Sequence, residues 1–107
     1  IGLMQSLAES TRLADQFGFS TDDLWQVLDG GPLAAPYAKM KLGMMASDDY
    51  TPQMHLQWAL KDAKLALDAS DSSLPALENI ASVWQQAVEA GHGEEDLAVI
   101  YKYLKSQ

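Results

Sequence analysis

The chain has 107 residues, 48% of them hydrophobic, which allows one small domain with a core and excludes two domains. Its 7 Lys and Arg against 15 Asp and Glu give a formal net charge of -8, so nucleic acid and anionic membranes are unfavourable partners. It contains no cysteine, which excludes disulfides, thiolate metal sites and cysteine nucleophiles and makes the cytoplasm the expected compartment.

The first predicted element is an amphipathic helix over residues 1–17. Its apolar residues recur every three or four positions, as one buried helix face requires. Gly18 predicts the end of the helix, because glycine readily adopts the left-handed conformation that closes a last turn. No capping residue precedes Ile1, although the periodicity is already present there. We therefore expect either a frayed end or the downstream part of a longer helix.

A second, short helix is predicted over residues 21–28. Ser20 suits its N-cap, since the hydroxyl can accept a hydrogen bond from the Asp23 amide. Acidic residues in the first turn also complement the positive end of the helix dipole. The Gly-Gly-Pro sequence at 30–32 then excludes a continuation of the helix.

Two further helices are predicted to begin at prolines. Pro36 suits a first helical turn because its missing amide would be unbonded there. Thr51-Pro52 is expected to start the fourth helix in the same way, and that helix should end near Ser70. Between the two helices, Asp48-Asp49 lacks the alternating oxygen ligands of a calcium loop. A solvated turn is expected there.

The last two helices flank a glycine-containing break. The fifth has Pro75 in its first turn and a regular apolar stripe as far as Val88, and the sixth is lined by apolar residues over 97–104. The break between them is Gly91-His92-Gly93. No segment alternates with a period of two, and no apolar run approaches the roughly 18 residues of a membrane span. The class is therefore predicted to be all-α, with about six helices.

Few residues suggest chemistry on their own. His55 and His92 lack ligand partners at metal-site spacing and are expected to be exposed. No serine has a recognisable base, and no phosphate-binding glycine loop is present. The helical spacing of the methionines favours core packing over an adaptable binding surface; they are Met40, Met44 and Met45. The tryptophans are expected to be core or interface anchors; they are Trp25, Trp58 and Trp84.

Lys61 and Asp62 are the one adjacent pair that could carry a function. Lys61 shares a polar helical stripe with Gln57 and Lys64, so its ammonium can reach across a surface or into a cleft. Asp62 falls at the border of the apolar face, where an unpartnered acid is costly to bury. The periodicity also fits, and by itself favours, a solvated flank in which Lys64 pairs with Asp68. Both interpretations stay open on the residues alone.

The order of several short motifs resembles one known family. Residues 2–9, followed by Leu13-Ala14 and Phe17-Gly18, are similar to the helix after the Lys-x-x-x-Asn motif of β-hydroxyacid dehydrogenases. That family includes 3-hydroxyisobutyrate dehydrogenase and tartronate semialdehyde reductase. Further similar segments follow in the family's order, the last resembling its Gly-x-Gly-x-x-Asp turn. They are Leu28–Gly31, Tyr50–Met54, Leu60–Ala66 and Ala90–Asp96. The resemblance covers essentially the whole chain.

The resemblance implies a fold and a set of site residues. Residues 1–107 would form a C-terminal helical domain, a bundle like the C-terminal domain of 6-phosphogluconate dehydrogenase, beside an N-terminal Rossmann-type domain absent from this chain. By similarity, Lys61 approaches the NAD or NADP cofactor, and Asp62 and Met54 line the substrate cleft. Met54 stands where the family usually has Phe. The family's glycine fingerprint and catalytic lysine have no counterpart here, so no catalytic residue, metal or bound cofactor is expected in these residues.

Two hypotheses follow from this sequence. The first is the cleft-forming and dimerisation domain of an NAD(P)-dependent oxidoreductase that acts on a small 3-hydroxy acid or semialdehyde, inactive alone and assembled as a homodimer or higher oligomer. The second is a stand-alone all-α module that docks a partner protein through an apolar face. The coding sequence upstream of Ile1 would discriminate them, since only the first hypothesis requires a dinucleotide fingerprint and a Lys-x-x-x-Asn motif there.

Overall fold

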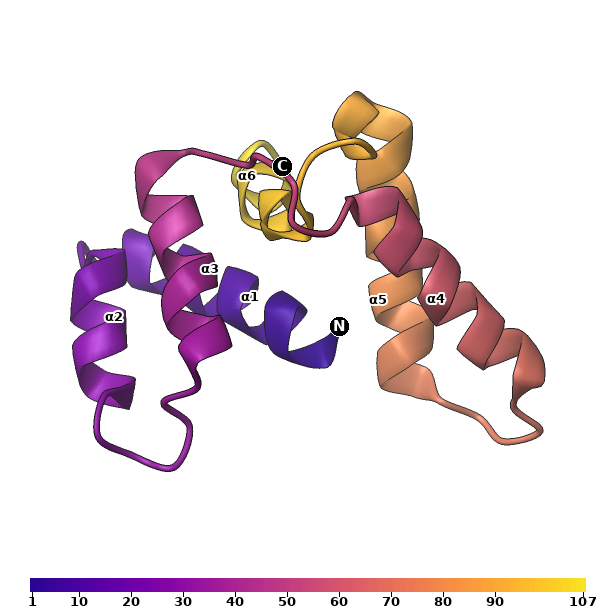
Figure 1. Ribbon diagram of the computed structural model, residues 1–107, viewed down its shortest axis with the longest axis horizontal. Helices are drawn as coiled ribbons and strands as arrows, with labels where there is room; N and C mark the ends of the chain where they lie inside the picture. Colours follow the sequence, from indigo (N-terminus) through magenta and orange to yellow (C-terminus); the bar gives the residue numbers. More distant parts are fainter.

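The computed structural model describes residues 1–107, and its regular structure is entirely helical (Figure 1). The six α-helices are α1 (Gly2–Gln16), α2 (Thr21–Leu28), α3 (Pro36–Ser47), α4 (Leu56–Ala69), α5 (Pro75–Ala87) and α6 (Ile100–Lys105). A π-helical turn, η1 (Val88–His92), extends α5, and a 3-10 turn, η2 (Leu97–Val99), leads into α6. The predicted all-α class is confirmed. None of these helices has the length and apolar composition needed to span a membrane.

The helices form two groups joined by a common core. Helices α1, α2 and α3 lie on one side, the antiparallel pair α4 and α5 on the other, and α6 lies between them against α1 (Figure 1). The centre of the core is made of fully buried side chains from both groups. They include Met4 of α1, Leu56 of α4, Trp84 of α5 and Ile100 of α6. The domain is therefore held together by the contact between the two groups.

Two predicted helix ends form through local hydrogen bonds. After α1, Gly18 has φ +80°, and the Phe19 amide donates to the Ala14 carbonyl oxygen at 2.9 Å, as in a Schellman motif. At the start of α2, the Ser20 hydroxyl accepts from the Asp23 amide at 3.1 Å, and the Asp23 carboxylate accepts from the Ser20 amide at 2.9 Å. This reciprocal capping box confirms the predicted N-cap.

The predicted start of the fourth helix is wrong. Helix α4 begins at Leu56, and residues 51–55 are not helical. The Thr51 hydroxyl, which was expected to cap a helix, instead donates to Asp49 Oδ1 at 2.7 Å. The next amides, of Gln53 and Met54, donate to the side chain of Asp96, far away in the sequence. A long-range partner has therefore replaced the local helical hydrogen bonds.

Several expected burial patterns hold only in part. Trp84 is fully buried, but Trp58 is 51% exposed and lies outside the core. Met45 is buried as predicted, whereas Met40 is 39% exposed, because α3 contacts the core through the neighbouring helical face. The two histidines are half-buried and not fully exposed. His92 Nδ1 lies 2.8 Å from a Glu95 carboxylate oxygen.

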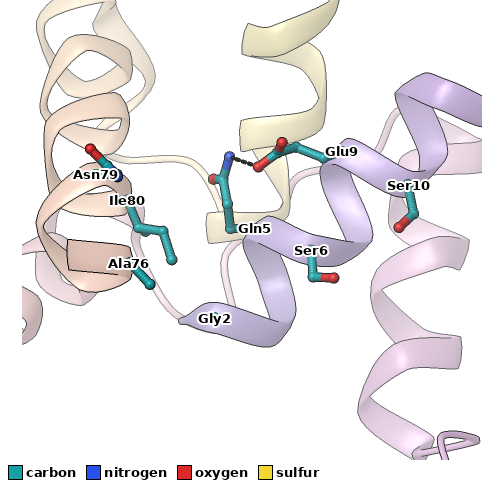
Figure 2. Close-up of a pocket in the computed structure, with 8 residues that line it drawn as sticks. All are labelled: Gly2, Gln5, Ser6, Glu9, Ser10, Ala76, Asn79 and Ile80. Atoms are coloured by element: carbon teal, nitrogen blue, oxygen red, sulfur yellow. Dashed lines mark hydrogen bonds between the residues drawn. The ribbon is translucent and has the colours of Figure 1, made fainter. Parts of the chain in front are cut away.

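A polar junction joins α1 to α5. The indole Nε1 of Trp84 donates to Gln5 Oε1 at 2.8 Å. Gln5 Nε2 in turn donates to Glu9 Oε2 at 2.8 Å (Figure 2). A shallow hollow of about 400 Å³ lies beside these residues and is lined mainly by exposed polar side chains. Because the buried Gln5 is fully hydrogen-bonded within the protein, we interpret the hollow as a structural junction.

Candidate functional site

An apolar groove of about 330 Å³ lies where α3, α4 and the segment before α4 meet. Its lining includes Tyr37 from α3, Met54 from the preceding segment and Asp62 from α4, together with the buried side chains of Trp84 and Leu97. Seven of its ten lining residues are hydrophobic, so a bound molecule would be largely shielded from water. Asp62 is the one carboxylate in this lining.

The structure brings together two of the three residues that the resemblance selected. Asp62 and Met54 line this groove, although they come from different elements. Lys61 is not part of the lining: its side chain is exposed, and its ammonium lies 5.9 Å from the centre of the Trp58 ring. It forms none of the ion pairs in the structure. Lys61 is therefore outside the lining, next to Asp62 in sequence, with an exposed side chain and no ion-pair partner.

The alternative pairing on this helix does not form. Lys64 Nζ donates to Gln85 Oε1 of α5, not to Asp68. This bond helps to join α4 to its neighbour. The polar stripe thus has two different parts, one that holds α5 and one, at Lys61, that faces solvent.

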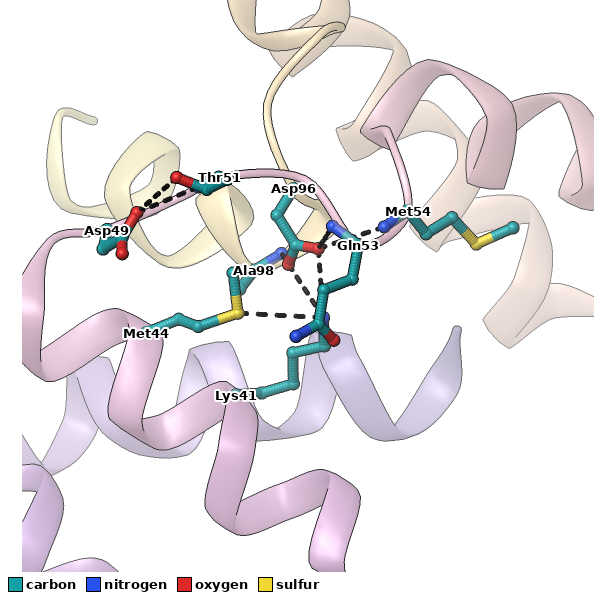
Figure 3. A network of polar contacts seen from close by, with 8 residues as sticks. All are labelled: Lys41, Met44, Asp49, Thr51, Gln53, Met54, Asp96 and Ala98. Carbon is teal, nitrogen blue, oxygen red and sulfur yellow. Dashed lines mark hydrogen bonds and ion pairs between the residues drawn. The ribbon is translucent and has the colours of Figure 1, made fainter.

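A buried ion pair lies in the wall opposite Asp62. Lys41 of α3 is 2% exposed and Asp96 is 0% exposed. The Lys41 Nζ lies 3.1 Å from Asp96 Oδ1 and 2.9 Å from Asp96 Oδ2 (Figure 3). Sequence reasoning missed Lys41, because its partner lies 55 residues away and a lysine on a helix is ordinarily exposed. The only available signal was that Lys41 interrupts the Met40–Met45 apolar region.

Asp96 also receives backbone hydrogen bonds from two segments. Its Oδ1 accepts from the Gln53 amide at 3.0 Å and the Met54 amide at 3.3 Å, and its Oδ2 accepts from the Ala98 amide at 2.9 Å (Figure 3). Burial by itself raises the pKa of the Asp96 carboxyl. The hydrogen bonds from Ala98, Lys41, Gln53 and Met54 outweigh this effect and hold the pKa below its ordinary value. Asp96 is therefore a buried carboxylate at neutral pH.

Tyr37 is the second polar residue of the α3 wall. Its ring centre lies 5.3 Å from the Lys41 ammonium, one helical turn away. Burial, and then the negative charge of Asp96, raise the pKa of the Tyr37 phenol above its ordinary value. The phenol is therefore a protonated hydrogen-bond donor within the groove at physiological pH.

Backbone bonds fix the turn that carries Asp96. Its amide donates to the Tyr50 carbonyl oxygen at 2.9 Å, and the Leu97 amide donates to the Met54 carbonyl oxygen at 3.0 Å. The first amides of α4 donate to this turn as well, Leu56 to the Glu95 carbonyl at 2.9 Å and Gln57 to the Gly93 carbonyl at 3.0 Å. The turn thus positions Met54 and the beginning of α4 together. No cluster of three or more His, Cys, Asp or Glu is placed to hold a metal ion.

The chain is similar to known proteins over nearly its whole length. The family described as "NAD-binding of NADP-dependent 3-hydroxyisobutyrate dehydrogenase" matches residues 2–104. Glyoxylate/succinic semialdehyde reductase 1 of Arabidopsis thaliana is 30% identical over 106 residues, which are 96% of this chain and 37% of that protein. Cytokine-like nuclear factor N-PAC of Drosophila melanogaster is 29% identical over 98 residues, which are 89% of this chain and 16% of that protein.

Solved structures share the fold over nearly all of the chain. A 3-hydroxyisobutyrate dehydrogenase from Salmonella typhimurium has a TM-score of 0.86 at 23% identity, covering 95% of this chain and 37% of that one. The Mycobacterium tuberculosis 3-hydroxyisobutyrate dehydrogenase with L-serine has a TM-score of 0.81 at 22% identity, covering 96% and 38%. The chain thus spans well under half the length of these relatives. Because the family match covers residues 2–104, the chain belongs to the β-hydroxyacid dehydrogenase family, which includes 3-hydroxyisobutyrate dehydrogenase.

Proposed function

We propose that this chain is the C-terminal, cleft-forming domain of an NAD(P)-dependent oxidoreductase that acts on a small 3-hydroxy acid or semialdehyde. The observation that carries the proposal is the meeting of Met54 and Asp62 in one apolar groove. Their role in a substrate cleft was assigned by the resemblance, and they come from separate elements. Their common groove supports a shared role in a substrate cleft.

The groove supplies one wall of such a cleft. Asp62 offers a hydrogen-bond acceptor for a substrate hydroxyl, and Tyr37 offers a donor for a carbonyl oxygen. Met54 and the other apolar side chains would exclude water, which favours hydride transfer over side reactions. The sequence contains no dinucleotide fingerprint and no Lys-x-x-x-Asn motif. The proton-transferring lysine and most of the cofactor contacts would therefore come from an N-terminal domain, and residues 1–107 alone would be inactive.

The residues beside the groove fit a contact with a nicotinamide cofactor. Lys61 presents a free ammonium next to the groove of an otherwise acidic chain, so it suits the negatively charged phosphates or the polar groups of such a ligand. Bound there, NAD or NADP would supply the hydride acceptor for a hydroxyl carbon. Lys61 would hold the cofactor against the groove, and Asp62 would orient the substrate.

The exposed apolar surface supports assembly with a partner subunit. Leu13 of α1 is 56% exposed and Val27 of α2 is 81% exposed, and between the two helices Phe17 is 66% and Phe19 59% exposed. Phe19 and Val27 line one mainly apolar pocket. Exposed apolar surface of this kind commonly marks an interface. We include a homodimer or higher oligomer in the proposal, with α1 and the tryptophan-bearing helices as contacts. The lack of cysteine makes the cytoplasm the proposed compartment.

The test uses the full-length gene product and residues 1–107 in parallel. We expect the full-length protein to oxidise small 3-hydroxy acids or reduce semialdehydes with NAD(H) or NADP(H), and residues 1–107 to show no turnover. Asp62→Asn should raise the substrate KM of the full-length enzyme, whereas the matched surface variant Asp71→Asn should not. Turnover by residues 1–107 alone, or an upstream coding sequence without a dinucleotide fingerprint, would contradict the proposal.

A second candidate function is a protein interaction module. It is favoured by the similarity to N-PAC, which is named a nuclear factor and not a reductase. In that case the exposed apolar surface of α1 and α2 would bind a partner, and the groove would have no catalytic role. An intact dinucleotide fingerprint and measurable dehydrogenase turnover in the full-length protein would reject this alternative.

A further inference from the structure

The buried ion pair requires an explanation beyond stability. Removing both charges of Lys41 and Asp96 from water is unfavourable, and their attraction compensates only when the geometry is good. An apolar pair of similar size is often equally stable in such a position. We therefore expect the pair to act by holding other parts of the protein in place.

Asp96 anchors the segment that carries Met54. The amides of Gln53 and Met54 both donate to Asp96 Oδ1, and neither makes a helical or sheet hydrogen bond. This segment is exposed, and the other backbone hydrogen bond at Met54 comes from the Leu97 amide to its carbonyl oxygen at 3.0 Å. The position of Met54 in the groove thus depends on the Asp96 carboxylate and on the turn that carries it.

Lys41 connects the Asp96 carboxylate to α3, the helix that carries Tyr37. Its ammonium points at both Asp96 oxygens, and Met44 Sδ lies 3.9 Å away, so no strong donor is left for a ligand. One turn earlier on α3, the Tyr37 ring lies beside the same ammonium. The charge of Lys41 is therefore used within the protein, between Asp96 and the Tyr37 ring, although the Lys41 side chain also lines the groove.

We propose that Lys41 and Asp96 are positioning residues that set the groove geometry, by holding the Gln53–Met54 backbone and the Tyr37 ring in fixed relation. This inference rests on the proposed function of the groove as a substrate cleft. Lys41 itself lines the groove, but its ammonium is bonded to Asp96 and is not free to bind a ligand. Its effect passes through Met54 and Tyr37.

The first test measures amide hydrogen exchange by NMR in residues 1–107 and needs no enzyme activity. In the neutral double variant K41M/D96N, we expect the Gln53 and Met54 amides to exchange about tenfold faster or more, while the α5 amides keep their rates. The double variant avoids an unpaired buried charge; if it does not fold, D96N alone is measured, with the same direction expected. Unchanged exchange at both amides would overturn the inference.

The second test measures steady-state kinetics of the full-length enzyme. We expect K41M/D96N to raise the substrate KM about fivefold or more with kcat within about twofold, because the groove loses its shape but the reacting groups stay. The matched control K102M/D71N removes the same charges from exposed positions and should leave both parameters unchanged. An unchanged KM overturns the inference. Lack of turnover in the wild-type enzyme instead rejects the proposed function, and the exchange result still decides the role of the pair.

Discussion

Each of two lysine–aspartate pairs contributes one residue to the groove lining, Asp62 from one and Lys41 from the other, and the pairs differ in burial and in bonding. Lys61 and Asp62 are adjacent in sequence on α4 and both are exposed. Lys41 and Asp96 are 55 positions apart, and both are buried and bonded to each other. Charges that meet a ligand must stay accessible, whereas charges that hold a wall must be satisfied within the protein. The comparison predicts that the buried pair controls folding and groove shape, and that the exposed pair controls ligand binding.

The largest expected effect tests the buried pair. Lys41→Met leaves Asp96 buried without its cation, so we expect the free energy of unfolding to fall by about 3–5 kcal/mol. Chemical denaturation of residues 1–107 measures this change. Lys61→Met, the same substitution on the exposed pair, should change stability by no more than about 0.5 kcal/mol. Equal effects of the two substitutions would break the comparison.

Acid titration should give the next largest effect. Because the pKa of Asp96 is lower in the folded state, the unfolded chain binds more protons between that pKa and the ordinary value of about 4. The stabilisation that the Asp96 carboxylate gives to the folded state is therefore fully present above the ordinary pKa of about 4. It is lost as the pH falls through the lower, folded-state pKa. Denaturation at a series of pH values should show this loss, and Asp96→Asn should reduce it. An identical acid profile in Asp96→Asn would argue against the described hydrogen bonds.

A half-buried tie between α1 and α6 provides an intermediate case. The Tyr101 hydroxyl donates to Asp15 Oδ2 at 2.5 Å. Burial, together with this bond and the Asp15 charge, raises the pKa of Tyr101 to about 12. The stabilisation is then fully present below pH 10 and is lost as the pH rises toward 12. We expect Tyr101→Phe to reduce the free energy of unfolding by about 1 kcal/mol at neutral pH, measured by urea denaturation. If Tyr101→Phe leaves the free energy of unfolding unchanged, this bond contributes as little to stability as the exposed charges do.

The smallest stability effect is expected at Lys61. Lys61→Ala should leave the unfolding midpoint of residues 1–107 nearly unchanged, because its ammonium faces solvent and joins no ion pair. In the full-length enzyme the same substitution should raise the KM for the nicotinamide cofactor about threefold, the size of one exposed charge contact. Lys102→Ala is the control for loss of positive charge. A cofactor KM that is unaltered by Lys61→Ala would remove Lys61 from the site.

Local sequence signals predicted most of the helices but not the groove wall. The cap at Ser20 and the end at Gly18 depend on residues within one turn, so periodicity and capping rules were sufficient. The start of α4 was placed too early, since its preceding amides bond to Asp96, more than 40 positions away. Such partners have no signature in a local pattern.

In the candidate site, too, some residues could be predicted from the sequence and others could not. Met54 and Asp62 were found through the resemblance, while periodicity left Asp62 undecided between a flank and a cleft. The buried state of Lys41 could not be predicted, because helix α3 shows no clear separation of polar and apolar faces around it. Trp58 was predicted to be a core or an interface anchor, because one large apolar residue does not reveal which surface its helical face meets; its 51% exposure excludes the core.

The way α4 begins has a consequence for the making of the protein. Its first two amides are satisfied by carbonyl oxygens of Gly93 and Glu95, which lie nearly forty positions downstream. On the ribosome, residues 56–69 leave the exit tunnel well before those carbonyls are available. In the nascent chain, the first amides of α4 therefore lack their hydrogen-bond partners until residues 93–95 have left the tunnel. Premature termination before residue 93 would leave a product that proteases readily degrade.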